Sequence, residues 1–251
     1  MRAGSIEAPD RANRSIDSFL SYMTVERGIS VNTVAAYRND LNQLARYMKG
    51  QGLLQTGGCP WGPVNGPALA DYVLWLHDQG YSDTTRARKV ASARSMFGFL
   101  MEEGLITQDP SEGLGSPRIG RSLPEVLTID QVERLLAAPG GDGPEVPRDR
   151  AMLELIYASG LRVSELVSLD LEDIDLEQGF VRCFGKGGKE RQVPLHPQAL
   201  DVIDDYIQRS RPALSNKGSG AAMFLNRRGD RMTRQGFWLL LKRYAKEAQI
   251  Q

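Results

Sequence analysis

The chain has 251 residues, of which 41% are hydrophobic and 25% are charged. This composition is typical of a globular protein, and the length suffices for two domains, each with a core of its own. No apolar run approaches the roughly 20 residues that cross a bilayer, and the polar segment 1–14 does not resemble a secretory signal. We therefore expect a cytoplasmic protein without a membrane span.

Basic and acidic residues are equally frequent, at 31 each, and this balance counts against a strongly basic, nucleic-acid-binding chain. Residues 1–121 carry 13 basic and 12 acidic side chains, which leaves 18 and 19 for residues 122–251. Neither half is therefore basic as a whole. Any contact with nucleic acid must come from local basic patches, because phosphate binding depends on where the charge lies.

Soft metal ligands are scarce in this sequence. The two cysteines, Cys59 and Cys183, lie far apart, and His77 and His196 are the two histidines. These residues favour neither a disulfide framework nor a cysteine-rich zinc site. We expect no metal and no cofactor.

The first half of the chain predicts four amphipathic helices, because apolar residues recur there at steps of three and four. The stripes are Ile16, Phe19, Leu20 and Met23; Val34, Tyr37, Leu41, Leu44 and Met48; Leu69, Val73 and Leu76; and Val90, Ala93, Phe97, Leu100 and Met101. Ser30 and Ser82 are suited to cap the second and fourth helices, and Pro67 to begin the third. Short connections between such helices predict a compact bundle over residues 10–104.

The second half has a mixed pattern and follows a linker. Residues 105–124 contain three prolines and three glycines, so we place a domain boundary in this segment, ahead of a domain at 125–251. The patterns of that domain predict a helix from a Thr128 cap to Leu136, helices over 148–158 and 163–169, strands over 180–184 and 191–195, a helix over 197–209 and a last helix from a Thr233 cap.

Four stretches carry a family resemblance. Residues 157–166 read YASGLRVSEL, 185–191 read GKGGKER with VPL at 193–195, 233–238 read TRQGFW, and 32–41 read NTVAAYRNDL. In this order and spacing they resemble the tyrosine site-specific recombinases, and especially the bacterial Xer branch, over nearly the whole chain. The resemblance implies an all-α, SAM-like core-binding domain followed by a mixed α+β catalytic domain with a small β-hairpin sheet.

The resemblance also implies a chemistry and two catalytic residues. Family members cut and rejoin double-stranded DNA through a phosphotyrosine intermediate, without a metal or ATP. Arg162 would be the first catalytic arginine, since a planar guanidinium matches the oxygens of a phosphate. Lys186, in the hairpin turn, would give a proton to the leaving oxygen. The competing interpretations are an ordinary i,i+3 ion pair between Arg162 and Glu165 and, for Lys186, a solvated turn lysine. We expect Glu165 to support its helix and not to act as a general base.

Local groups of basic residues are candidate DNA contacts. They lie on the fourth helix, in the linker, in the hairpin and before the last helix, and they are Arg86, Arg88, Lys89, Arg94, Arg118, Arg121, Lys189, Arg191, Arg231 and Arg234. Each group taken alone is equally well explained as a solvated face. Several of them in a chain of zero net charge favour phosphate contacts.

The implied assembly is a homo- or hetero-tetramer with a related recombinase on two DNA sites. For the Xer branch the implied task is the resolution of chromosome dimers at cell division. Phage and transposon integrases share the same core, so a role in the integration of a mobile element stays open.

In the family, a His-x-x-Arg motif, a further His or Trp and the nucleophilic tyrosine follow these stretches, and this sequence, which ends at Gln251, contains none of them. Tyr244 lies upstream of the position expected for the nucleophile. One alternative is therefore a catalytically inert DNA-binding protein that occupies recombination sites, forms no covalent DNA adduct and tetramerises weakly. Another is a helical binding module without a DNA role, for which DNA binding would be absent or insensitive to salt.

Overall fold

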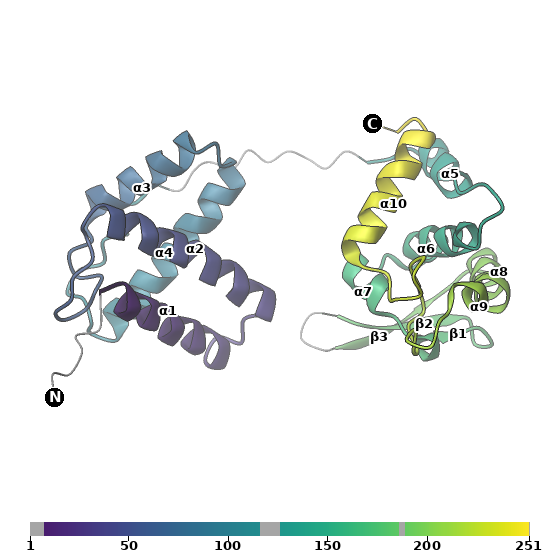
Figure 1. The fold of residues 1–251 in the computed structure, drawn as a ribbon, viewed down its shortest axis with the longest axis horizontal. Helices are drawn as coiled ribbons and strands as arrows, with labels where there is room; N and C mark the ends of the chain where they lie inside the picture. The colour runs from purple at the N-terminus through teal and green to yellow at the C-terminus, as the bar shows by residue number, and fades with distance from the viewer. Residues whose placement is uncertain (1–7, 116–125, 186–188, 251) are drawn as a thin grey trace. The chain divides into compact units, whose positions relative to one another are not determined.

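The computed structural model divides the chain into two compact units, Met1–Leu123 and Pro124–Gln251 (Figure 1). The structure describes residues 8–115, 126–185 and 189–250. Three of the predicted site residues, Arg118, Arg121 and Lys186, lie outside the described residues. Within those residues, no helix combines the length and the apolar character of a membrane-spanning segment.

The N-terminal unit is a bundle of four helices, as the apolar stripes predict. The helices are α1 (Ala8–Val25), α2 (Val31–Gly50), α3 (Gly66–Asp78) and α4 (Asp83–Glu102). The Ser30 hydroxyl accepts the backbone N–H of Thr33 at 3.2 Å, and the Ser82 hydroxyl accepts that of Thr85 at 3.3 Å. Both predicted serine caps are confirmed, since each satisfies a backbone donor that the first turn of a helix leaves free.

The core of this unit also takes a residue from a loop. Trp61, in the Gly- and Pro-rich connection before α3, is fully buried and meets Phe97 edge-to-face, with 5.9 Å between the ring centroids. Met101 was predicted in the apolar stripe of α4, but its side chain is 44% exposed and the prediction is wrong. Steps of three and four residues from Ala93 lead to Met96 and Phe97 on the same face of α4, and Met96 is fully buried. Met101 follows Leu100 by one residue, which turns its side chain by about 100° around the helix axis and away from the core.

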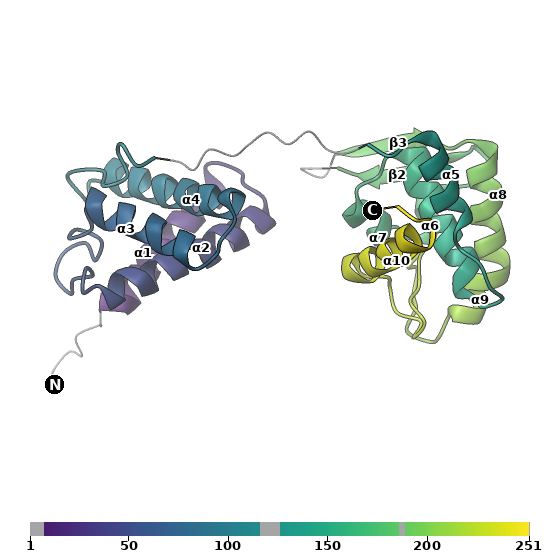
Figure 2. The same cartoon turned by 90° about the horizontal axis from the view of Figure 1, so that it is seen from above.

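The C-terminal unit combines helices with a small antiparallel sheet (Figure 2). Its helices are α5 (Ile129–Ala137), α6 (Glu145–Ser159), α7 (Val163–Ser168), α8 (Pro197–Asp205), α9 (Arg211–Leu214) and α10 (Arg234–Glu247). The strands β1 (Ile174–Asp175), β2 (Phe180–Phe184) and β3 (Glu190–Pro194) lie in the order β1-β2-β3. A helical domain followed by an α+β domain with a hairpin sheet confirms the predicted fold class.

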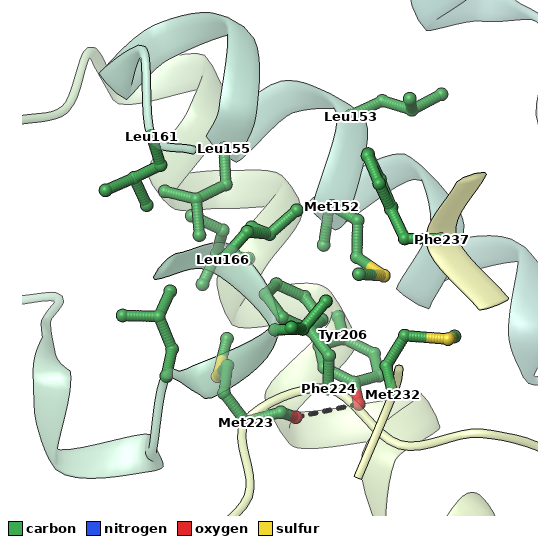
Figure 3. Packing of buried hydrophobic residues seen from close by; sticks show 14 of the residues in the cluster. Met152, Leu153, Leu155, Leu161, Leu166, Tyr206, Met223, Phe224, Met232 and Phe237 are labelled. Carbon is green, nitrogen blue, oxygen red and sulfur yellow. Dashed lines mark hydrogen bonds between the residues drawn. The ribbon is translucent and has the colours of Figure 1, made fainter. Parts of the chain in front are cut away.

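Two features of this unit were not predicted. Strand β1 has only two residues, too few for an alternating pattern to be visible. The helix predicted over 197–209 is interrupted: α8 ends at Asp205, Tyr206–Ser210 form a π-helical turn, and α9 follows. At the start of that turn the buried Tyr206 donates its hydroxyl to the carbonyl of Met223 at 2.9 Å (Figure 3).

The core of the C-terminal unit brings together residues that are distant in sequence. Figure 3 shows Leu155 of α6, Leu166 of α7 and Phe237 of α10 around the aromatic pair of Tyr206 and Phe224. These two rings are stacked, with centroids 5.5 Å apart. Through Leu166, α7 packs in this core against α6 and α10, and α7 is the helix that carries the candidate catalytic arginine at its start.

A buried carboxylate links α6 to α10. Asp149 is fully buried, and its Oδ1 accepts hydrogen bonds from Arg148 Nε at 2.8 Å and Nη2 at 2.6 Å. Its Oδ2 accepts from Arg243 Nη2 at 3.0 Å and from the hydroxyl of Tyr244 at 2.8 Å. The charge of Asp149 is therefore both paired and fully hydrogen-bonded, which is the condition under which a buried charge is tolerated.

We predict that Asp149→Ala lowers the free energy of unfolding of the C-terminal unit by about 3–5 kcal/mol, because it leaves a buried guanidinium, Arg148, without its counter-charge. Native-state hydrogen exchange of the α6 amides measures this, since it reports on this unit separately. Glu247→Ala is the control, because the Glu247 carboxylate lies 3.9 Å from Arg243 Nε at the surface, where an ion pair contributes below about 1 kcal/mol. Equal effects of the two substitutions would contradict the prediction.

Candidate functional site

A left-handed glycine places Arg162 at the start of α7. Gly160 ends α6 with φ 61° and ψ 25°, a conformation that residues with a Cβ adopt only at a cost. The chain reverses there, Leu161 enters the core, and Arg162 becomes the N-cap residue of α7 with extended backbone angles. The Arg162 side chain is 67% exposed. Its guanidinium is therefore held beside the protein surface and open to a ligand.

Glu165, one turn into α7, joins Arg162 to the hairpin. Its Oε2 accepts the backbone N–H of Arg162 at 2.9 Å, and its Oε1 accepts Arg162 Nη1, also at 2.9 Å. From strand β3, Arg191 donates Nη1 to Oε1 at 3.1 Å and Nη2 to Oε2 at 2.7 Å. One buried carboxylate thus holds two guanidiniums that are 29 positions apart in the sequence.

These contacts stabilise the charged form of Glu165. The hydrogen bonds from Arg191 and Arg162 lower the pKa of its carboxyl to about 2, although burial acts in the opposite direction. With two guanidiniums and one carboxylate, the cluster has a net charge of +1. The site is therefore electropositive in a chain whose overall charge is zero, and it suits an anion with planar or tetrahedral oxygens.

An arginine holds the carboxyl end of α7. Arg231 donates Nη1 to the carbonyls of Ser168 and Leu169, both at 2.8 Å, and pairs with Asp170. A cation at the carboxyl end of a helix satisfies carbonyls that have no partner within the helix. Arg231, predicted to contact DNA, is thus bound within the domain, with 40% of its side chain exposed.

Lys189 and Arg234 remain at the surface. Lys189 is exposed just before β3, and its carbonyl accepts the N–H of Gly185 at 2.8 Å, which closes the hairpin turn. Arg234 is the exposed first residue of α10, whose N-cap is Thr233 as predicted. Both side chains are therefore accessible to solvent.

In the N-terminal unit, the predicted basic group of α4 is divided between the surface and the interior. Lys89 is only 4% exposed, and its Nζ lies 2.9 Å from Oδ1 of the fully buried Asp40. Arg88 pairs with the other oxygen of Asp40, and 42% of its side chain is exposed. Lys89 is thus bound within the bundle in this structure, and we leave it out of the surface proposed below, whereas Arg88 reaches solvent.

The two remaining arginines of α4 have partners nearby. Arg86 pairs with Asp83 in the first turn, and 16% of its side chain is exposed. Arg94 is exposed and donates to the carbonyl of Leu114. Ile106 and Leu114 pack against the N-terminal core, so the residues after α4 stay with this unit.

The central position of Glu165 and the pairing of Arg191 were not predicted from the sequence. A spacing of three residues indicated a contact between Glu165 and Arg162, but no local pattern indicated a contact from β3. In the described part of the chain, no group of three or more His, Cys, Asp or Glu residues is placed to hold a metal ion.

Known families match both units. Residues 125–251 match the phage integrase family, and residues 16–104 match the N-terminal SAM-like domain of phage integrases. The chain is 44% identical over 233 residues to tyrosine recombinase XerC of Herpetosiphon aurantiacus, which covers 92% of this chain and 74% of that protein. It is 41% identical over 235 residues to tyrosine recombinase XerD of Pseudomonas aeruginosa, with coverages of 94% and 77%.

Solved structures share the fold. XerH recombinase bound to palindromic difH substrate, in a post-cleavage complex, matches with a TM-score of 0.70 at 16% identity and covers 100% of this chain and 75% of that one. A lambda integrase dimer bound to a COC' core site matches with a TM-score of 0.69 at 18% identity, with coverages of 95% and 81%. Together with both domain matches and relatives above 40% identity, this shows that the chain belongs to the phage integrase family, in its Xer branch of tyrosine recombinases.

Proposed function

We propose that this chain acts in site-specific DNA recombination and that Arg162 binds a phosphate of the DNA strand that is exchanged. The observation that carries the proposal is the Arg162 guanidinium, which Glu165 fixes while 67% of the side chain stays exposed. A guanidinium has five N–H donors, and one contact to Glu165 leaves others for phosphate oxygens. The family relationship supports DNA recombination as the reaction, and the geometry of the Arg162–Glu165 contact supports Arg162 as the phosphate-binding residue.

The reaction would be a phosphoryl transfer with covalent catalysis. A tyrosine oxygen bonds to the phosphorus of a DNA phosphodiester while the bond from phosphorus to the 5′ oxygen breaks, and a hydroxyl of a partner duplex later reverses this step. Arg162 would neutralise the negative charge that gathers on the non-bridging oxygens. Lys186 would give its proton to the leaving 5′ oxygen, since a lysine ammonium can act as a general acid.

Tyr244 is not suited to be that nucleophile. Its hydroxyl donates to the buried Asp149 at 2.8 Å, and burial with this hydrogen bond raises the pKa of Tyr244 to about 12. A phenol held in this way is both inaccessible and difficult to ionise. Its role is to join α10 to α6.

The partner would be double-stranded DNA, with Arg88, Arg94, Lys189 and Arg234 as further phosphate contacts and with Arg118 and Arg121 as contacts from the linker. We propose a homo- or hetero-tetramer with a related recombinase on two sites, in line with the lambda integrase tetramer bound to a Holliday junction. The similarity to XerC and XerD favours the resolution of chromosome dimers over the integration of a mobile element. Such a protein would act in the cytoplasm.

We predict that binding of a duplex of about 30 base pairs weakens linearly with the logarithm of salt concentration, with a slope of about −0.9 for each phosphate contact. Arg162→Ala should make this slope shallower by about 0.9 and weaken binding at low salt by about tenfold. Fluorescence anisotropy measures both the slope and the affinity. Salt concentrations from about 50 to about 200 mM cover the range in which affinity changes strongly.

Arg209→Ala is the matched control, because Arg209 is 82% exposed and pairs with Asp205 four residues before it. It should leave the slope and the affinity unchanged. Binding by the unaltered chain that is absent or insensitive to salt would instead favour a helical module without a DNA role.

A second prediction concerns Tyr244→Phe. It should lower the free energy of unfolding of the C-terminal unit by about 1.5–3 kcal/mol, because a hydrogen bond to a buried charge is lost, and it should leave duplex affinity within about twofold. Native-state hydrogen exchange and anisotropy measure the two effects. Tyr157→Phe is the control, since Tyr157 is 59% exposed on α6, the helix that carries Asp149. Weakened DNA binding at unchanged stability would identify Tyr244 as a DNA contact and contradict the assignment.

A further inference from the structure

Arg191 connects the sheet to α7 through both of its terminal nitrogens. It lies on β3 opposite Cys183 of β2, and its two contacts to Glu165 measure 3.1 Å and 2.7 Å. Parallel hydrogen bonds between a guanidinium and a carboxylate fix orientation as well as distance. To bind a phosphate with the same two nitrogens, Arg191 would have to release a nearly buried carboxylate.

Arg191 also lies against the base of the hairpin turn. A Cβ added to Gly185 would come within 3.2 Å of Arg191 Nη1, so the glycine leaves room for the guanidinium. The N–H of this glycine donates to the carbonyl of Lys189 and closes the turn. Arg191 therefore lies beside Gly185, the residue that follows β2, and also contacts the carboxylate that orients Arg162.

The pKa shifts of Arg191 and Glu165 agree with a stable ion pair between these two side chains. Glu165 raises the pKa of Arg191 by accepting its hydrogen bonds, and Arg191 is the largest cause of the lowered pKa of Glu165. Since the same carboxylate also accepts from Arg162, a displacement of Arg191 would leave Glu165 with a single guanidinium partner. The position of one arginine thus depends on the other.

We infer that Arg191 is a positioning residue: through Glu165 and Gly185 it holds the β2–β3 hairpin against the start of α7 and thereby sets the orientation of Arg162. This inference rests on the proposed function, because it assumes that Arg162 binds the phosphate. It differs from the prediction made from the sequence, in which Arg191 itself contacts DNA. The two roles have different consequences for the hairpin without DNA and for the salt dependence of binding.

Three variants separate these roles. Arg191→Gln removes the paired contact, and Arg191→Lys keeps the charge while losing the planar, paired donors. Lys189→Gln is the matched control, since it removes a cation that is exposed in the same hairpin. If Arg191→Gln does not fold, as judged by the unfolding transition of the C-terminal unit, Arg191→Lys takes its place in every measurement below.

The first measurement is amide hydrogen exchange of β2 and β3 without DNA. Arg191→Gln should accelerate exchange of these amides by about tenfold and Arg191→Lys by less, whereas Lys189→Gln should leave it unchanged. Unchanged exchange in the Arg191 variants would overturn the proposal. Equal acceleration by Lys189→Gln would overturn it as well, because the cause would then be the charge of the hairpin and not the contact with Glu165.

The second measurement is the salt dependence of duplex binding. A positioning residue contacts no phosphate, so Arg191→Gln should weaken binding by a few-fold and keep the slope of the unaltered chain. A slope shallower by about 0.9 would show that Arg191 is itself a phosphate ligand and would overturn the proposal. Glu165→Gln combined with Arg191→Gln should affect exchange by less than the sum of the single effects, since both remove one interaction.

The titration of Glu165 gives a readout that a general loss of packing would not produce. Carbon-13 NMR of its carboxyl should give a pKa of about 2 in the unaltered chain and a clearly higher value in Arg191→Gln. Because the pKa of Glu165 is lower in the folded chain than its unfolded value near 4.5, its ionised carboxylate stabilises the fold above that pH, and this stabilisation is lost as the pH falls towards 2. In Arg191→Gln this stabilisation is smaller, so acid unfolding should begin at a higher pH. An unshifted pKa would contradict the inference.

If the unaltered chain shows no salt-dependent binding, the proposed function fails, while exchange and titration still decide the role of Arg191.

Discussion

The carboxylate of Glu165 is the contact on which the arrangement of the candidate site depends. It lies nearly buried at the start of a six-residue helix and accepts hydrogen bonds from two arginines of different elements. A helix of this length is not stable by itself, so its position depends on the packing of Leu166 in the core and on contacts at its two ends. Glu165 provides them at the amino end, and Arg231 provides them at the carboxyl end. The orientation of Arg162 follows from the position of this helix.

The same physical solution recurs twice with other residues. In the N-terminal unit the buried Asp40 accepts from Lys89 and Arg88, and in the C-terminal unit the buried Asp149 accepts from Arg148, Arg243 and Tyr244. Asp40 and Asp149 are each shared by a buried cation and by an arginine that reaches solvent. At Glu165 and Asp40 two cations share one carboxylate, so these two groups keep positive charge in a chain with zero net charge.

Local patterns in the sequence were sufficient for the fold class. Apolar stripes, serine caps and the glycine-rich hairpin concern residues within a few positions of one another, and the observed helices and strands follow them closely. Signals that are short or atypical were missed, such as the two-residue strand β1 and the π-helical turn at Tyr206. The burial of Trp61 was missed for another reason, since a residue in a loop has no periodicity to reveal which side faces the core.

Residue types at fixed spacing were enough to indicate the family resemblance, the two-part architecture and the candidates Arg162 and Lys186. Which charged side chains are bound within the protein became clear from the fold. The fold pairs Arg191 with Glu165 and Lys89 with Asp40. The sequence alone does not distinguish these paired basic residues from the exposed ones. The reason is that pairing depends on distances between elements far apart in the chain, and packing of the core fixes those distances.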